Sequence, residues 1–127
     1  MISSLLTKSV RQAGREPVLF RLKIRYGVEW MKKQQVRGIV IGRTMMFADA
    51  PWDVPEWLFR HEMQHVYQIA RLGFVRFYLL YFYYSLRYGY ANNPFEVEAR
   101  KAQTESLTAE ERVLWKLREG STQSPKT

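Results

Sequence analysis

The chain has 127 residues, of which 46% are hydrophobic and 15% aromatic, so it can build one globular domain with a modest core. It contains no cysteine, which excludes disulfides, thiolate metal sites and cysteine nucleophiles. The net charge of +8 favours anionic partners, or it serves only to keep a small aromatic-rich protein in solution, since the basic residues are spread along the chain.

The N-terminal part predicts a helix and then a strand. Apolar residues recur near helical spacing over residues 1–14, and Gly14 would end that helix. Over residues 17–26 the apolar residues alternate with a basic face, which favours a half-buried strand over a helix. That basic face holds Arg21, Lys23 and Arg25.

A β-hairpin is predicted next. Residues 27–35 form a linker or a short helical turn before it. Residues 36–41 and 44–47 have the character of strands, and Gly42 and Arg43 form the tight turn between them.

A long helix is predicted over residues 54–72. Asp53 can cap its N-terminus, Glu56 lies three residues later, and Pro55 stands in the first turn, where its missing N–H costs little. Gly73 would end the helix.

Two more helices follow in the prediction. Residues 74–88 are aromatic on nearly every side, which is typical of a central helix that is buried on most sides. Asn93 as cap and Pro94 as first residue begin the next helix, which we expect to reach about Glu105.

The last helix is predicted over residues 109–119, after a capping box at residues 108–111 and before Gly120. The polar tail at residues 121–127 is expected to be disordered. The prediction is therefore a single α+β domain over residues 1–120, with an antiparallel hairpin or three-stranded sheet followed by about four helices.

The two histidines of the chain stand in the pattern His61-Glu62-x-x-His65, within the predicted long helix. Residues four apart lie one above the other on a helix, so both imidazoles can bind one ion. Glu62 is about 100° further around the helix, beside that ion, where a carboxylate can take a proton from the attacking water. A zinc hydrolase needs this arrangement, and the pattern therefore predicts zinc as a cofactor.

A catalytic zinc site usually has three protein ligands. Because the chain has no other His and no Cys, the third ligand must be Asp or Glu, and the best candidates are Glu96 and Glu98. These two lie about 200° apart around a helix, so both cannot face the ion. Glu96 could instead be the capping-box partner of Asn93, and Glu98 could be a solvated surface charge.

The segments HEMQHVYQ and NPFEVEA resemble those of small zinc metallopeptidases of the minimal HExxH type. These include domain-of-unknown-function families near the core domain of extracellular contractile injection systems. More broadly, the chain is similar to gluzincins, whose third ligand begins an E-x-x-A pattern on a following helix, as residues 96–99 do here. The resemblance covers roughly residues 36–101.

The resemblance implies a zincin-like core and a peptidase that acts on peptide or protein substrates. It implies that His61, His65 and Glu96 are the zinc ligands and that Glu62 is the general base. In many gluzincins an Asp or Asn after the Ala supports a ligand histidine, whereas this chain has Arg100 there.

The implied mechanism has two further requirements. Residues 44–47 would form an edge strand that pairs with an extended substrate backbone. A developing oxyanion would need a donor. The candidates for that donor are Tyr67, Tyr84, Tyr88, Tyr90 and Arg100.

The aromatic stretch at residues 74–90 leaves other interpretations open. It could be an interfacial helix or dimer surface, with Arg71, Arg76 and Arg87 on the phosphates of an anionic membrane. Basic residues among aromatics also suit single-stranded nucleic acid, but the chain has no recognised nucleic-acid motif, which disfavours that partner. The alternative function is thus a non-catalytic zinc-binding module, or one that contacts a membrane surface or nucleic acid.

No secretory signal is visible, and the most apolar run, residues 77–86, is about half of the ~20 residues that span a bilayer. We therefore expect a cytoplasmic protein, peripheral to a membrane if the interfacial interpretation holds.

Overall fold

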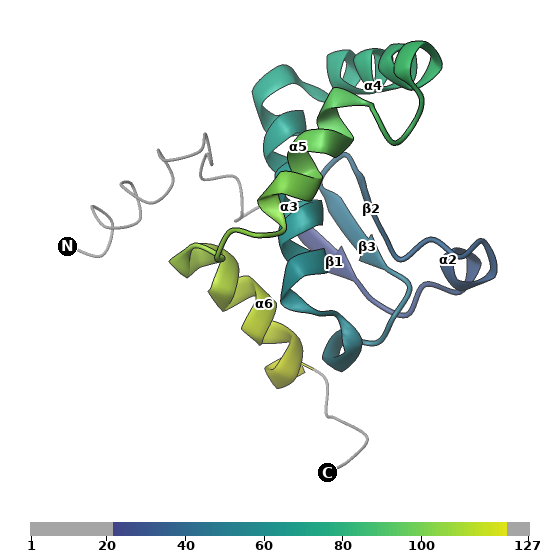
Figure 1. Ribbon diagram of the computed structural model, residues 1–127. Coiled ribbons are helices and arrows are strands. Elements are labelled where there is room, and N and C mark those ends of the chain that lie inside the picture. The colour runs from purple at the N-terminus through teal and green to yellow at the C-terminus, as the bar shows by residue number, and fades with distance from the viewer. Residues whose placement is uncertain (1–21, 122–127) are drawn as a thin grey trace.

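The structure is a computed structural model that describes residues 22–121, and it shows the predicted α+β fold. The three-stranded sheet packs against helix α3, α5 lies along α3, and α4 crosses the end of the α3–α5 pair (Figure 1). The helix expected over residues 1–14 and nearly all of the predicted tail lie outside the described residues.

The sheet contains β1 (Lys23–Arg25), β2 (Gly38–Ile41) and β3 (Thr44–Phe47). β2 and β3 form the predicted antiparallel hairpin, and Gly42 in its turn has a φ of +62°, a conformation that glycine adopts without strain. β1 pairs with β3 in parallel, so the strand order is β1-β3-β2.

This order corrects one prediction. The strand at residues 44–47 is central and hydrogen-bonded on both sides, and it cannot accept a substrate strand. β2 is the edge strand of the hairpin. The hairpin was predictable because it is local, whereas the pairing of β1 with β3 joins residues 21 positions apart, such as Lys23 and Thr44.

The core lies between the sheet and α3 (Glu56–Leu72). Met45 and Phe47 of β3 are fully buried against this helix, together with Phe59 and Met63. The short helix α2 (Glu29–Lys33) packs a second, smaller cluster on the alternate residue Met46. Its five residues agree with the predicted short helical turn.

The start of α3 differs from the prediction. Residues 51–53 form a separate turn of 3-10 helix, and Pro55 occupies the N-cap position without a side-chain hydrogen bond. Asp53 is therefore not the cap. The end is as predicted, since Gly73 has a φ of +89° and its N–H bonds the Ile69 carbonyl at 2.7 Å.

Helix α5 (Pro94–Ala102) begins as predicted, with the Asn93 side chain accepting a hydrogen bond from the Phe95 N–H. It ends three residues earlier than expected. Helix α6 (Ala109–Ser121) has the predicted capping box, in which the Thr108 and Glu111 side chains bond each other's backbone N–H groups at 3.2 and 2.9 Å. It continues through Gly120, which was expected to end it.

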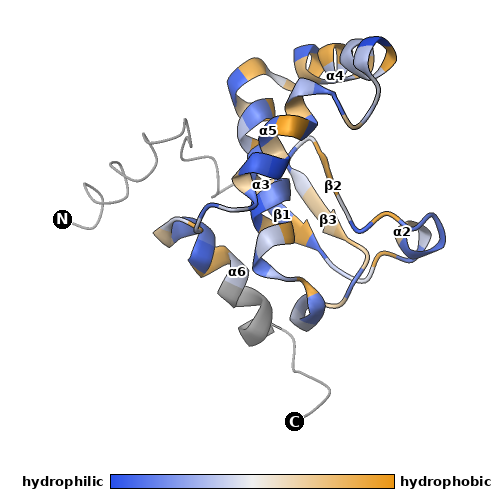
Figure 2. Ribbon diagram, viewed as in Figure 1, coloured by the Kyte–Doolittle hydropathy of each residue, from blue (hydrophilic) through white to orange (hydrophobic). Residues whose placement is uncertain are grey.

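Helix α4 (Phe74–Tyr88) contradicts the prediction of burial on most sides, because Phe77 is its one buried residue. Figure 2 shows apolar residues along this outlying helix. None of the helices in the described part of the chain is long and apolar enough to cross a membrane.

Candidate metal centre

Two helices bring together His61, His65 and Glu96. The histidines are one turn apart on α3, and Glu96 lies in the first turn of the neighbouring α5. His61 Nε2 is 3.2 Å from Glu96 Oε1, and His65 Nε2 is 3.2 Å from Glu96 Oε2. One potential ligand atom from each residue lies within 4.8 Å of the others, so this group could hold a metal ion.

The other ring nitrogen of each histidine is held by a glutamine. Nδ1 of His61 is 2.7 Å from the amide oxygen of Gln103, and Nδ1 of His65 is 2.8 Å from that of Gln68. The amide nitrogen of Gln68 donates to the Phe95 carbonyl at 3.1 Å, which fixes its oxygen towards His65. Both Nδ1 atoms therefore carry hydrogen, and both Nε2 atoms are directed at the Glu96 carboxylate.

This donor set fits a divalent cation. With each Nδ1–H bonded to an amide oxygen, an Nε2 that donates to Glu96 must carry the second proton of an imidazolium. A cation between the rings and the carboxylate would replace those protons with one positive centre. Two imidazole nitrogens and a carboxylate oxygen are the ligands of several catalytic zinc sites.

The glutamine supports were missed by the sequence analysis, which looked for support at residue 100. Gln68 could have been found, because it follows His65 by three residues and shares its helix face. Gln103 lies just beyond the end of α5, and no local pattern marks it. Arg100 instead donates a hydrogen bond to the Ala91 carbonyl.

Glu98, the second candidate for a third ligand, lies outside the cluster. Its Oε1 accepts hydrogen bonds from the amides of Gln68 at 2.7 Å and Gln64 at 3.1 Å. Glu98 thus orients Gln68, whose amide oxygen in turn bonds His65. The separation of about 200° around α5 explains why Glu96 and Glu98 take different places.

The charges of the cluster are strongly coupled. Burial of Glu96 opposes its ionisation, but hydrogen bonds with His61 and His65 hold its pKa well below the usual range. Burial lowers the pKa of His65, yet the Glu96 hydrogen bond and the charge of Glu62 outweigh it and raise that pKa. Tyr81 also donates to Glu96 Oε2, at 2.5 Å, so the carboxylate has partners on both oxygens.

Glu62 lies beside the cluster, against the edge strand. Its side chain is 5% exposed, and burial raises the pKa of its carboxyl above the usual value. A Cβ placed on Gly38 would be only 2.8 Å from Glu62 Oε2 and 2.9 Å from Cγ. The missing side chain at Gly38 therefore makes the space that the Glu62 carboxyl occupies.

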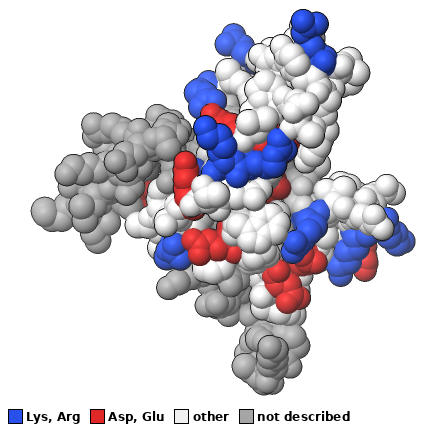
Figure 3. Space-filling model, in the orientation of Figure 1, with Lys and Arg blue, Asp and Glu red and all other residues white. Residues whose placement is uncertain are grey.

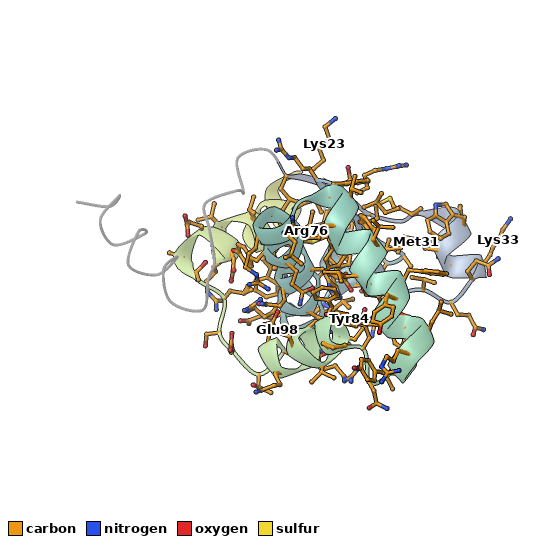
Figure 4. All side chains as sticks on the ribbon, turned by 90° about the horizontal axis from the view of Figure 1, so that it is seen from above. Lys23, Met31, Lys33, Arg76, Tyr84 and Glu98 are labelled. Atoms are coloured by element: carbon orange, nitrogen blue, oxygen red, sulfur yellow. The ribbon has the colours of Figure 1, made fainter. Side chains whose placement is uncertain are left out.

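A cavity of about 650 Å³ opens over these residues. His61, Glu62 and His65 line it from α3, and the edge strand β2 lines it from the side. α4 supplies another wall through Phe77, Tyr78 and Tyr81. Seen from above, α4 is the layer nearest the viewer and lies across the elements beneath it (Figure 4).

Of the five residues expected as oxyanion donors, only Tyr90 lines the cavity. Burial, together with the negative charges of Glu96 and Glu62, raises the pKa of its hydroxyl. Tyr67 instead donates to Glu111 at 2.5 Å within the core. Tyr84, Tyr88 and Arg100 are not among the residues that line the cavity.

Comparisons of the chain with protein-family models, with curated proteins and with solved structures gave no match. The resemblance to gluzincins therefore stays a prediction. What supports a function is the chemistry of the described residues.

Proposed function

We propose that the protein is a zinc-dependent metallopeptidase. The observation that carries the proposal is the convergence of His61, His65 and Glu96 beside a buried glutamate, Glu62, in a cavity bordered by an edge strand. Zinc is the preferred ion because the donor set is two imidazoles and one carboxylate. When bound, zinc would polarise the scissile carbonyl and increase the acidity of water.

In this proposal Glu62 is the general base. It would take a proton from the attacking water and later deliver that proton to the leaving amine. Its burial supports this role, because a carboxyl with a raised pKa accepts a proton more readily than one in water. Gly38 contributes by leaving the carboxyl room beside the cluster.

The edge strand β2 would hold the substrate backbone. The carbonyl of Arg37 faces β3 and accepts a backbone hydrogen bond on that side. Backbone groups alternate in direction along an antiparallel strand, so the N–H and C=O groups of Gly38 and Val40 face outward, away from β3. The Val40 carbonyl already accepts a hydrogen bond from Tyr78 at 2.7 Å. The N–H and C=O of Gly38 and the N–H of Val40 then remain to pair with an extended peptide.

Tyr90 is the proposed donor to the developing oxyanion. It lies at the cavity near both acidic side chains. A tyrosine hydroxyl is protonated at neutral pH at its ordinary pKa, and the raised pKa of Tyr90 preserves that state. A neutral O–H can donate a hydrogen bond to an oxygen that becomes negative, whereas a phenolate cannot.

The test of the proposal is Glu62→Gln, assayed for metal content and for hydrolysis of a peptide library. The amide keeps the size of the side chain but cannot accept the proton, so we expect full zinc content and a turnover lower by about 10²–10⁴-fold. Glu110→Gln on α6 is the control, because Glu110 is an acidic residue outside the cavity. Turnover by Glu62→Gln equal to that of wild type would remove Glu62 from the role of base.

A further inference from the structure

The outward side of α4 is an exposed apolar surface. Val75, Leu79, Phe82 and Leu86 recur at intervals of four, three and four, so they form one stripe along the helix. Their exposed fractions are 66%, 67%, 64% and 72%. We call these four residues the outer face of α4. The opposite side carries Phe77 and Tyr81, which line the cavity.

The charged residues of α4 that flank the outer face are all basic. The sequence from Met63 to Phe95 contains no Asp or Glu. Arg76 and Arg87 are both exposed, and at about 100° per residue they lie on the same flank of the stripe, near its two ends. On the side seen in Figure 3, the surface over α4 at the top of the view is white and blue.

Large exposed apolar patches in soluble proteins mark surfaces that bind something. A second copy of the chain is a poor occupant, because an isologous contact would bring the same acid-free surface and leave the arginines without counter-charges. An anionic bilayer offers both an apolar environment and negative charge. Its acyl chains accept Leu and Phe side chains, and its phosphates pair with arginine. The positive charge and the apolar stripe therefore both favour an anionic bilayer as the partner.

We propose that the outer face of α4 docks the protein on an anionic lipid bilayer. The helix has 15 residues, so it is about 22 Å long and would lie in the plane of the interface. Arg76 and Arg87 would sit on one flank at headgroup level, with Phe82 and Leu86 below.

Docking would place the cavity close to the membrane. The same helix that presents the outer face forms a wall of the cavity through Phe77, Tyr78 and Tyr81. The cavity would then be about one helix diameter, roughly 10 Å, from the headgroups. Proteins with extended segments next to the bilayer would be the accessible substrates, and this last step alone rests on the proposed function.

Vesicle flotation tests the docking itself. The wild-type chain should float with vesicles of phosphatidylcholine containing 30% phosphatidylserine at low salt and remain unbound with phosphatidylcholine alone. Leu79→Ser/Phe82→Ser should weaken binding by at least ~30-fold, because two large apolar side chains no longer enter the bilayer. The matched control is Val97→Ser/Val113→Ser, which changes two exposed apolar residues on α5 and α6 and should bind like wild type.

A second pair of variants tests the charge. Arg76→Gln/Arg87→Gln should reduce binding by about 30-fold, because each arginine near an anionic surface contributes roughly a factor of five. Lys32→Gln/Lys33→Gln removes the same charge from exposed positions on α2 and should have little effect. Glu62→Gln should float like wild type, which separates docking from hydrolysis.

Three results would overturn the proposal. The first is no flotation of the wild-type chain at low salt, and the second is flotation that Leu79→Ser/Phe82→Ser leaves unchanged. The third is a lipid-free dimer of the wild-type chain, seen by sedimentation, that the same double variant dissociates. That result would assign the outer face to self-association.

Discussion

Replacing Gly38 by alanine should displace the Glu62 carboxyl. The new Cβ would lie 2.8 and 2.9 Å from Glu62 Oε2 and Cγ, closer than Cβ atoms approach non-bonded atoms in proteins, and 3.0 Å from Cδ. Gly38 is not among the residues with positive φ, so alanine fits the backbone and the contact with Glu62 is the expected cost. Because Cγ is involved and the side chain is buried, rotating the carboxyl end alone does not relieve the clash.

The expected loss of stability is about 1–3 kcal/mol, the usual cost of inserting a methyl group into a packed site. For a chain of this size that corresponds to a decrease in Tm of about 4 °C per kcal/mol. In a Glu62→Ala background the clashing atoms are gone, and Gly38→Ala should be neutral or slightly stabilising, because alanine is favoured over glycine within a strand.

The assay is a double-mutant cycle of urea or thermal unfolding on wild type, the two single variants and the double variant. We expect a coupling energy of about 1–3 kcal/mol between positions 38 and 62. Ile41→Ala, at an exposed position of the same strand, is the control and should change stability by less than about 0.5 kcal/mol. If Gly38→Ala costs the same free energy in both backgrounds, Glu62 does not occupy the space beside Gly38 and its placement as a base is wrong.

Three further predictions concern the cluster and the cavity. Gln103→Ala should weaken zinc binding by about 10–100-fold in a chelator competition, because the Nδ1–H of His61 loses its acceptor; unchanged affinity would show that this hydrogen bond does not orient the ring. Zinc occupancy measured by dialysis should fall as the pH decreases below about 7, because the raised pKa of His65 lets protons compete at a higher pH than at an ordinary histidine; full occupancy at pH 5 would contradict this. Tyr90→Phe should lower kcat by about 10²–10³-fold with little change in zinc content, and an unchanged kcat would exclude Tyr90 as the oxyanion donor.

The features predicted correctly from the sequence were those fixed by neighbouring residues. Asn93 and Pro94 begin α5, Gly73 ends α3, and the hairpin closes around Gly42, because caps and tight turns depend on the backbone of a few consecutive residues. The two histidines of the candidate cluster were found for a similar reason, since His61 and His65 are four positions apart on one helix face.

Two local signals failed, since Asp53 does not cap α3 and Gly120 does not end α6, but the larger errors arose where contacts between distant segments decide the outcome. The place of β3 between β1 and β2 depends on a pairing that no local pattern signals. The exposure of α4 could not be inferred from its composition, because a helix that is apolar all round is normally buried. The support of His61 by Gln103 joins residues 42 positions apart and becomes visible only once α5 lies along α3.

The most direct measurement of the central claim is the zinc content of four purified proteins: wild type, His65→Ala, Glu96→Gln and Glu98→Gln. The last two form a matched pair, since they change neighbouring glutamates on the same helix and only Glu96 lies in the cluster. We expect one zinc ion per chain in wild type and Glu98→Gln, and little or none in His65→Ala and Glu96→Gln. Equal zinc in all four, or loss in Glu98→Gln with retention in Glu96→Gln, would contradict the assignment of the metal centre.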